Sequence, residues 1–174
     1  MSLAVCPGSF DPITRGHLDI VRRASVLFEE VVVLVVINPD KHCAFTIDER
    51  CDMIRQATAG IPGVRVDSYY GLLADYVRAA GAAAIVKGLR AMSDFEYEFQ
   101  MALTNKSLIP YAETVFLTTS VENMYVSSSL VRQVAGFGGN ISDFVPRCLV
   151  KTIMKRLAPQ PGEDGKTEAV SHEH

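Results

Sequence analysis

Apolar runs typical of buried strands alternate with helical patterns along almost the whole chain of 174 residues. The longest run spans residues 31–37 and contains only Val, Leu and Ile. It is far shorter than the roughly 20 residues that cross a bilayer, so it indicates a buried strand. Strands that are apolar on both faces and separated by helices are typical of a parallel sheet. The predicted strands are residues 3–6, 31–37, 64–67, 83–86 and 114–117.

Helical patterns fill the intervals between these strands. Apolar residues at helical spacing predict a first helix that begins near Thr14. Capping-box pairs predict the starts of the second and fourth helices, namely Thr46 with Glu49 and Ser93 with Glu96. The other predicted helices are residues 72–80, 128–135 and 142–158. We therefore predict a single-domain α/β fold, a Rossmann-like, doubly wound parallel sheet of five strands with helices on both faces.

Residues 1–158 contain no internal repeat or linker, so we predict one domain there. Residues 159–174 contain two Pro, two Gly and no apolar periodicity, which predicts a disordered tail. The chain has 17 Lys and Arg against 20 Asp and Glu, and the tail holds four of these acids and one base. Residues 1–158 are therefore formally neutral, and neither nucleic acid nor an anionic membrane is an expected partner.

The cysteines and the N-terminal residues predict a cellular compartment. Cys6, Cys43, Cys51 and Cys148 show no C-x-x-C spacing, and the first residues show no export-signal pattern. We therefore expect a reduced, cytoplasmic protein without structural zinc.

Glycines, cations and hydroxyls follow the predicted strands directly, where ligands of open parallel sheets bind. Gly8 and Ser9 come after the first strand, and Gly16 and His17 open the next helix. Glycine allows the backbone close to a ligand, and a helix N-terminus attracts phosphate. A core or capping role would explain an isolated histidine, but beside this loop His17 is better explained as a phosphate contact.

Further cations and hydroxyls follow other strands. Lys41 comes after the second strand, and Lys87-Gly88-Leu89-Arg90 after the fourth. Lysine meets phosphate as a point charge and arginine as a planar fork. After the fifth strand, Ser127-Ser128-Ser129 is consistent with plain helix capping or with a further phosphate contact.

These residues include no Ser-His-Asp set, no metal-ligand cluster and no carboxylate pair. Donors and cations suit phosphoryl or nucleotidyl transfer, in which catalysis is mainly positioning and stabilisation of charge on phosphate oxygens. A nucleophile that arrives already ionised, such as a phosphate monoester, needs no general base.

Three motifs together resemble those of a known enzyme family. They are Pro7-Gly8-Ser9-Phe10-Asp11-Pro12 with Thr14-Arg15-Gly16-His17, Lys87-Gly88-Leu89-Arg90 with Asp94-Phe95-Glu96-Tyr97-Glu98, and Val126-Ser127-Ser128-Ser129-Leu130-Val131. The first is similar to the signature of the nucleotidylyltransferase superfamily. All three in this order resemble the bacterial phosphopantetheine adenylyltransferase family over about residues 3–157. The resemblance implies transfer of AMP from ATP to 4′-phosphopantetheine, which gives dephospho-CoA and pyrophosphate.

The same resemblance implies roles for individual residues. Four of them would act on the transition state, namely His17, Lys41, Lys87 and Arg90. The residues implied in ATP binding are Ser9, Phe10, His17, Gly88, Leu89, Arg90, Glu98, Asn123, Met124, Tyr125, Val126, Ser127, Ser128 and Ser129. Those implied in binding the acceptor are Ser9, Lys41, Leu73 and Lys87. Mg²⁺ would arrive with ATP, held mainly by the phosphates, so no metal site of the protein is expected.

The resemblance also concerns assembly and regulation. Members of the family are commonly hexamers and can be inhibited by coenzyme A, so both properties are expected.

Two alternatives stay open. The same chemistry could use another acceptor, such as nicotinamide mononucleotide or glycerol phosphate, or the chain could be a nucleotide-binding regulator without catalysis. The presence of His17 together with Lys41, Lys87 and Arg90 argues against the regulator.

Overall fold

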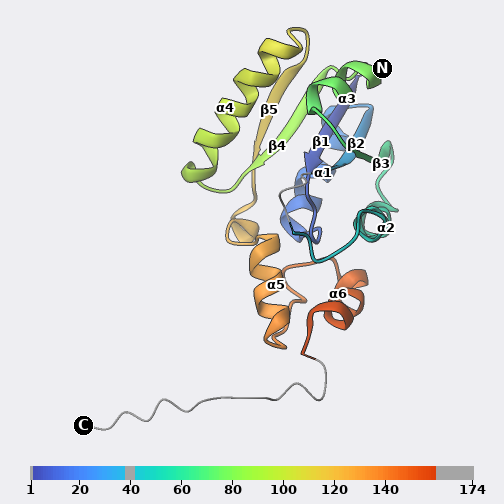
Figure 1. The fold of residues 1–174 in the computed structure, drawn as a ribbon, viewed down its shortest axis with the longest axis vertical. Coiled ribbons are helices and arrows are strands. Elements are labelled where there is room, and N and C mark those ends of the chain that lie inside the picture. The colour runs from blue at the N-terminus through green and yellow to red at the C-terminus, as the bar shows by residue number, and fades with distance from the viewer. Residues whose placement is uncertain (1, 38–41, 160–174) are drawn as a thin grey trace, which may run out of the picture.

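The computed structural model describes residues 2–37 and 42–159. Its strands are β1 (Leu3–Gly8), β2 (Glu30–Val36), β3 (Val64–Tyr69), β4 (Ala84–Leu89) and β5 (Glu113–Thr118). They form one sheet in the order β3-β2-β1-β4-β5, and neighbouring strands pair in parallel. The predicted five-stranded parallel sheet is therefore confirmed, with β1 at its centre (Figure 1).

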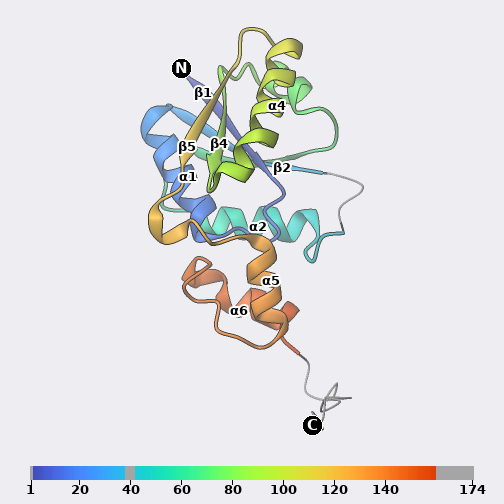
Figure 2. The same ribbon diagram turned by 90° about the vertical axis from the view of Figure 1, so that its left-hand side faces the viewer.

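Helices cover both faces of the sheet (Figure 2). These helices are α1 (Arg15–Leu27), α2 (Ile47–Thr58), α3 (Leu73–Ala80) and α4 (Met92–Leu108). The alternation along β2 shows how the two layers are divided. Val31, Val33 and Val35 pack with residues of α1 and α2, whereas Val32 and Leu34 pack with residues of α3. Because successive side chains of a strand point to opposite faces, the sheet is doubly wound as predicted.

Two helices, α5 (Ser128–Gly136) and α6 (Val150–Leu157), lie beyond the carboxyl ends of the strands (Figure 1). Short 3₁₀ turns at Val121–Asn123 and Arg147–Leu149 lead into them. Their apolar side chains join those of α1, α2 and β2 in a single core cluster. This end of the sheet is therefore partly covered by the C-terminal helices of the same chain.

Local capping residues set several helix ends where the sequence predicts them. Thr14 and Thr46 are the N-caps of α1 and α2, and both take part in capping boxes. Gly81 ends α3 with a φ of 65°, in the left-handed region that favours glycine.

Four predicted boundaries are wrong. The helix expected over residues 142–158 begins only at Val150, because Pro146 has no N–H to donate and disfavours helical backbone before it. The fourth helix has Ala91 as its N-cap without a side-chain cap, so Ser93 is not the start. Strands β1 and β4 extend through Gly8 and Leu89 because their ladders with β2 and β5 continue there.

The predicted domain boundary at residue 158 falls just after α6 ends at Leu157. Of the predicted tail, residues 160–174 lie outside the described residues. None of the helices in the described part of the chain is long and apolar enough to cross a membrane.

Candidate active site

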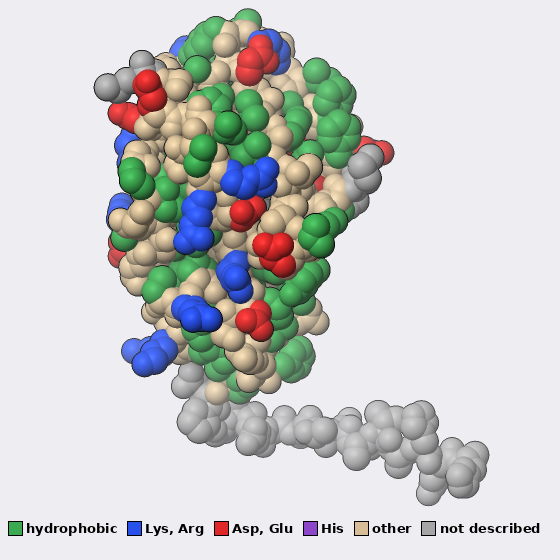
Figure 3. All heavy atoms as spheres, turned by 180° about the vertical axis from the view of Figure 1, so that it is seen from behind, with side chains coloured by type: hydrophobic (Ala, Val, Ile, Leu, Met, Phe, Trp, Pro, Cys, Tyr) green, Lys and Arg blue, Asp and Glu red, His purple; other side chains and the backbone are tan. Residues whose placement is uncertain are grey.

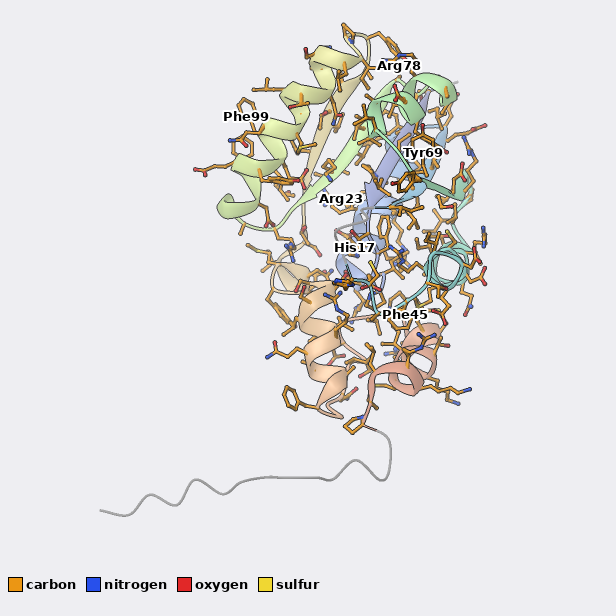
Figure 4. The ribbon with its side chains drawn as sticks, in the orientation of Figure 1. His17, Arg23, Phe45, Tyr69, Arg78 and Phe99 are labelled. Atoms are coloured by element: carbon orange, nitrogen blue, oxygen red, sulfur yellow. The ribbon has the colours of Figure 1, made fainter. Side chains whose placement is uncertain are left out.

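The sheet changes direction of winding between β1 and β4. The chain passes from β1 to β2 on one side and then returns to place β4 on the other side of β1. In open α/β sheets, ligands bind outside the carboxyl ends of the strands at this switch point. His17 lies on α1, which follows β1, whereas Lys87 lies near the end of β4 and Arg90 directly follows that strand. Figure 4 shows His17 at the lower end of the sheet, above α5.

The His17 ring is fixed by the N-terminal cap of α1. The Thr14 main-chain N–H donates to Nδ1 of His17 at 3.1 Å, and the Thr14 hydroxyl also lies 3.1 Å from Nδ1. In return, the His17 main-chain N–H donates to Thr14 Oγ1 at 3.3 Å. Because a main-chain N–H can only donate, Nδ1 carries the lone pair, and the proton of the neutral ring is on Nε2. His17 therefore has one N–H donor free to meet a ligand.

The environment of His17 keeps its ring neutral. Burial, together with the nearby charges of Arg90 and Lys87, lowers the pKa of His17 from 6.5 to about 4. The Phe10 ring packs edge-on against the imidazole, with the two ring centroids 5.1 Å apart. His17 therefore lies close enough to Lys87 and Arg90 for their charges to affect its protonation.

Helix α4 places a carboxylate on each of the two cations. Lys87 Nζ lies 3.1 Å from Glu98 Oε2, and both side chains are mostly buried. Arg90 Nε lies 3.2 Å from Asp94 Oδ2, and its Nη1 donates to the Val126 carbonyl at 3.4 Å. The ion pairs hold the two cations in defined positions. An incoming phosphate would therefore share or displace carboxylate partners.

Gly88 and Leu89 are strand residues of β4, which extends beyond its predicted end at residue 86. A Cβ on Gly88 would lie only 2.9 Å from Cγ1 of Ile20, which is buried on α1. A glycine at this position allows α1 to pack closely on β4. The structure thus gives Gly88 a packing role beside the implied contact with nucleotide.

The loop after β1 is held by buried polar groups that the sequence does not single out. The Asp11 carboxylate, 4% exposed, accepts the main-chain N–H groups of Ala44 and Phe45 at 2.9 and 3.0 Å. Arg132 of α5 lies with Nη1 3.3 Å from Asp11 Oδ2 and also donates to the Asp11 carbonyl. These contacts tie α5 and the residues before α2 to the loop that precedes His17.

Ser9 and Phe10, which the family resemblance implies in ATP binding, belong to the same loop. Arg50 is buried on α2 and donates through Nη1 to the Ser9 carbonyl at 2.9 Å, which fixes Ser9 beside the switch point. Phe10 has a φ of 48°, in the strained left-handed region, and its ring is buried in the core. Its side chain is therefore used in packing against His17 and the core.

The serine triplet connects α5 to the loop after β1. Ser127 is the N-cap of α5, and its side chain accepts from the Leu130 N–H at 3.1 Å. Ser128 donates to the Pro12 carbonyl at 2.7 Å. Ser129 is exposed, with Oγ 3.4 Å from Nη2 of Arg132. Ser127 therefore has the helix-capping role that the sequence allows. The phosphate contact stays a prediction for the same N-terminus of α5.

The segment before this triplet lies against the start of α1. Asn123 is buried and donates to Ser120 Oγ at 2.8 Å. A Cβ on Gly16 would lie 3.7 Å from Cβ of Asn123. Met124 and Tyr125 are exposed, and Val126 is buried. Of these four residues, Asn123 lies beside Gly16, and the carbonyl of Val126 contacts Arg90.

Two further predicted residues are Lys41 and Leu73. Lys41 lies outside the described residues, so its role stays a prediction. Leu73 begins α3, beyond the end of β3, and packs against the core formed with Val32 and Leu34. In the described ranges 2–37 and 42–159, no group of three or more His, Cys, Asp and Glu is arranged to hold a metal ion.

The doubly wound sheet and a histidine and two cations at its switch point define a nucleotidyltransferase of the α/β class. A family model described as cytidylyltransferase-like matches residues 5–134. Curated relatives named phosphopantetheine adenylyltransferase include that of Heliobacterium modesticaldum, 54% identical over 169 residues, with 97% of this chain and 98% of the relative covered. Those of Caldanaerobacter subterraneus and Clostridium kluyveri are 50% and 52% identical over 157 residues, which cover 90% of this chain and 98% and 96% of each relative. The chain belongs to the phosphopantetheine adenylyltransferase family.

Proposed function

We propose that the protein transfers the adenylyl group of ATP to 4′-phosphopantetheine, with dephospho-CoA and pyrophosphate as products. The observation that carries the proposal is the neutral His17 with its N–H donor on Nε2, beside Lys87 and Arg90 at the switch point. The names and high identity of the relatives support the choice of acceptor.

In the proposed step, a phosphate oxygen of 4′-phosphopantetheine attacks the α-phosphorus of ATP. A new P–O bond forms as the bond between the α-phosphorus and the bridging oxygen breaks, and pyrophosphate leaves with that electron pair. The attacking oxygen is already ionised, so no proton has to be removed. His17 donates from Nε2 to the α-phosphate oxygens as negative charge develops, and it stays neutral throughout.

In this proposal, different cations of the site bind the acceptor phosphate and the β- and γ-phosphates of ATP. Lys87, with Lys41, holds the phosphate of the acceptor, and Arg90 with residues 127–129 binds the β- and γ-phosphates. ATP enters as its magnesium complex, with the ion held mainly by the phosphates. The described donor set suits this arrangement, because the carboxylates Glu98 and Asp94 are engaged by Lys87 and Arg90.

Pyrophosphate release tests the proposed function directly. Purified protein is incubated with ATP, Mg²⁺ and one acceptor at a time: 4′-phosphopantetheine, nicotinamide mononucleotide or glycerol phosphate. We expect release with 4′-phosphopantetheine only. Release with another acceptor alone would reassign the substrate, and no release with any of them would favour a regulator without catalysis.

His17→Ala tests the role of the histidine. We expect kcat to fall by roughly 10²- to 10³-fold with little change in KM, because the lost donor acts on charge that develops in the transition state. Turnover close to that of the unmodified protein, in a variant that unfolds at the same urea concentration, would remove His17 from the mechanism.

Lys87→Ala tests how the cations are divided between the two substrates. We expect KM for 4′-phosphopantetheine to rise more than KM for ATP, because Lys87 holds the acceptor phosphate in the proposed arrangement. Lys151→Ala is the matched control, since it removes one exposed lysine charge on α6, a helix that carries none of the predicted site residues. An equal rise in both KM values for Lys87→Ala would contradict the assignment.

We further propose that the chain assembles into a hexamer and that coenzyme A inhibits it. Large apolar side chains exposed on α4 support self-association, namely Phe95, Tyr97, Phe99, Met101 and Leu103. Coenzyme A contains the phosphopantetheine arm of the acceptor, so we expect it to compete for this site. Light scattering gives the mass of the assembly, and competition kinetics measure the inhibition.

We also propose that the protein works in the cytoplasm. Its four cysteines are free, which fits a reducing compartment.

A further inference from the structure

A cationic cavity lies away from the switch point, on the outer side of α1. It has a volume of about 450 Å³ and is bounded by α1, the end of α2 and the segment before α6. Its charged lining residues are Arg15, Arg22 and Arg147. Figure 3 shows the face of the molecule opposite to that of Figure 1, where basic side chains form a band with acidic ones beside it.

The cavity and His17 lie on different sides of one helix. Arg15, Leu18 and Arg22 follow one another at helical spacing and line the cavity together. His17 lies between the first two in sequence but turns toward the sheet, where its ring meets Phe10. The cavity is therefore separate from the catalytic site, although both use the first turn of α1.

Carboxylates of the described residues do not neutralise the guanidinium groups of this cavity. Arg15 donates through Nη1 to the main-chain carbonyl of Asp143 at 3.4 Å, which leaves its charge unneutralised. Within the described ranges, Arg22 and Arg147 form no ion pair with a carboxylate. The acidic residue on the same helix, Asp19, is paired with Arg23 instead. Three like charges around one cavity repel one another unless an anion joins them.

The rest of the lining indicates what kind of anion fits. Leu18, Ala57 and Val145 provide an apolar wall, and Ser142 adds a polar group. Arginine forks match the oxygens of a phosphate, and three of them balance a dianion better than a monovalent ion. An apolar wall beside a bound phosphate can contact the organic part of a phosphate ester.

We propose that this cavity binds a small phosphate monoester, with the phosphate held by Arg15, Arg22 and Arg147 and the organic part against Leu18 and Val145. The site is distinct from the proposed site of adenylyl transfer. It is present whatever acceptor the enzyme uses.

Cys148 provides a reporter inside the cavity. It lines the cavity and is exposed, whereas Cys6 and Cys51 are buried. In a Cys43→Ser background, the rate of reaction of Cys148 with 4,4′-dithiodipyridine, a neutral disulfide, is measured at fixed ionic strength. Phenyl phosphate and inorganic phosphate are titrated against that rate. We expect both to protect Cys148 saturably, with phenyl phosphate effective at a several-fold lower concentration.

Variants locate the protection. Arg22→Ala with Arg147→Ala should weaken protection by phenyl phosphate at least about tenfold, the loss expected for a charge-assisted hydrogen bond. Arg55→Ala with Arg78→Ala removes two exposed arginines on other helices and should leave protection unchanged.

Lys87→Ala separates this site from the catalytic site. It should also leave protection unchanged, although it impairs turnover. The proposal is overturned by an absence of saturable protection, by unaltered protection in the Arg22 and Arg147 variant, or by lost protection in Lys87→Ala. Equal potency of the two phosphates would overturn the part of the proposal that concerns the ester.

Discussion

The neutral state of His17 makes the stability of the protein depend on pH. Burial and two nearby cations lower the pKa of this ring from 6.5 to about 4. Between these two values the unfolded chain binds a proton that the folded chain does not bind, so the free energy of unfolding decreases as the pH falls. The contribution of His17 is complete above about pH 6.5 and is lost progressively down to about pH 4. Between about pH 7 and about pH 5 the loss amounts to about 2 kcal/mol.

His17→Gln is the matched control for this prediction. Glutamine at the third position of a helix also reaches back to the N-cap N–H, so the variant keeps the capping box with Thr14 but does not titrate. Urea unfolding is followed by circular dichroism from about pH 7 to about pH 5 for both proteins. The protein concentration is held fixed, because assembly also affects apparent stability. Carboxylates titrate equally in both, so the difference between the two curves isolates His17.

Two results would refute this reasoning. Curves that stay parallel within about 0.5 kcal/mol would show that His17 takes up a proton equally well in the folded state. A pKa of His17 near 6.5, measured from its ring proton shifts by NMR, would show the same directly. Either result would also remove the basis for a permanently neutral donor at the switch point.

Two further predictions concern packing and buried charge. Gly88→Ala should lower the free energy of unfolding by about 1–3 kcal/mol, because its Cβ would lie 2.9 Å from Cγ1 of Ile20. Urea unfolding of the double variant with Ile20→Ala should show a smaller loss than the sum of the single losses, and simple additivity would contradict the proposed contact. Asp11→Ala leaves the N–H groups of Ala44 and Phe45 without their acceptor and the partly exposed Arg132 without its carboxylate, and should lower the same free energy by about 1–3 kcal/mol or more. A loss below about 1 kcal/mol in urea unfolding would mean that this pair does not hold the loop.

The features that the sequence predicts correctly are those with local causes. The Thr46 capping box and the glycine at position 81 act within a few residues, so spacing alone locates those helix ends. The apolar run at residues 31–37 is long enough to identify the strand before its partners are known. For the candidate site, the sequence predicts only that His17, Lys87 and Arg90 lie near one another, because strand ends of a parallel sheet meet at one edge. Their roles in binding and catalysis stay predictions.

The features that it misses depend on residues distant in the chain. Arg132 reaches Asp11 across 121 positions, and Arg50 reaches Ser9 across 41. No local pattern marks such pairs. Gly88 is another example, because only the position of Ile20 on α1 shows why a side chain does not fit there. The carboxylates that hold the cations lie on α4, and their partners become evident only when that helix is placed over β4.

The central position of β1 affects how the chain is made. β1 ends at Gly8, but its second neighbour, β4, begins only at Ala84. A growing chain that has reached α3 therefore holds β1 with one edge unpaired, and residues such as Ala4 and Val5 offer free backbone groups and apolar side chains there. An unpaired, apolar strand edge can pair with another chain. Until β4 is made, this edge of β1 is open to pairing with another unfinished chain.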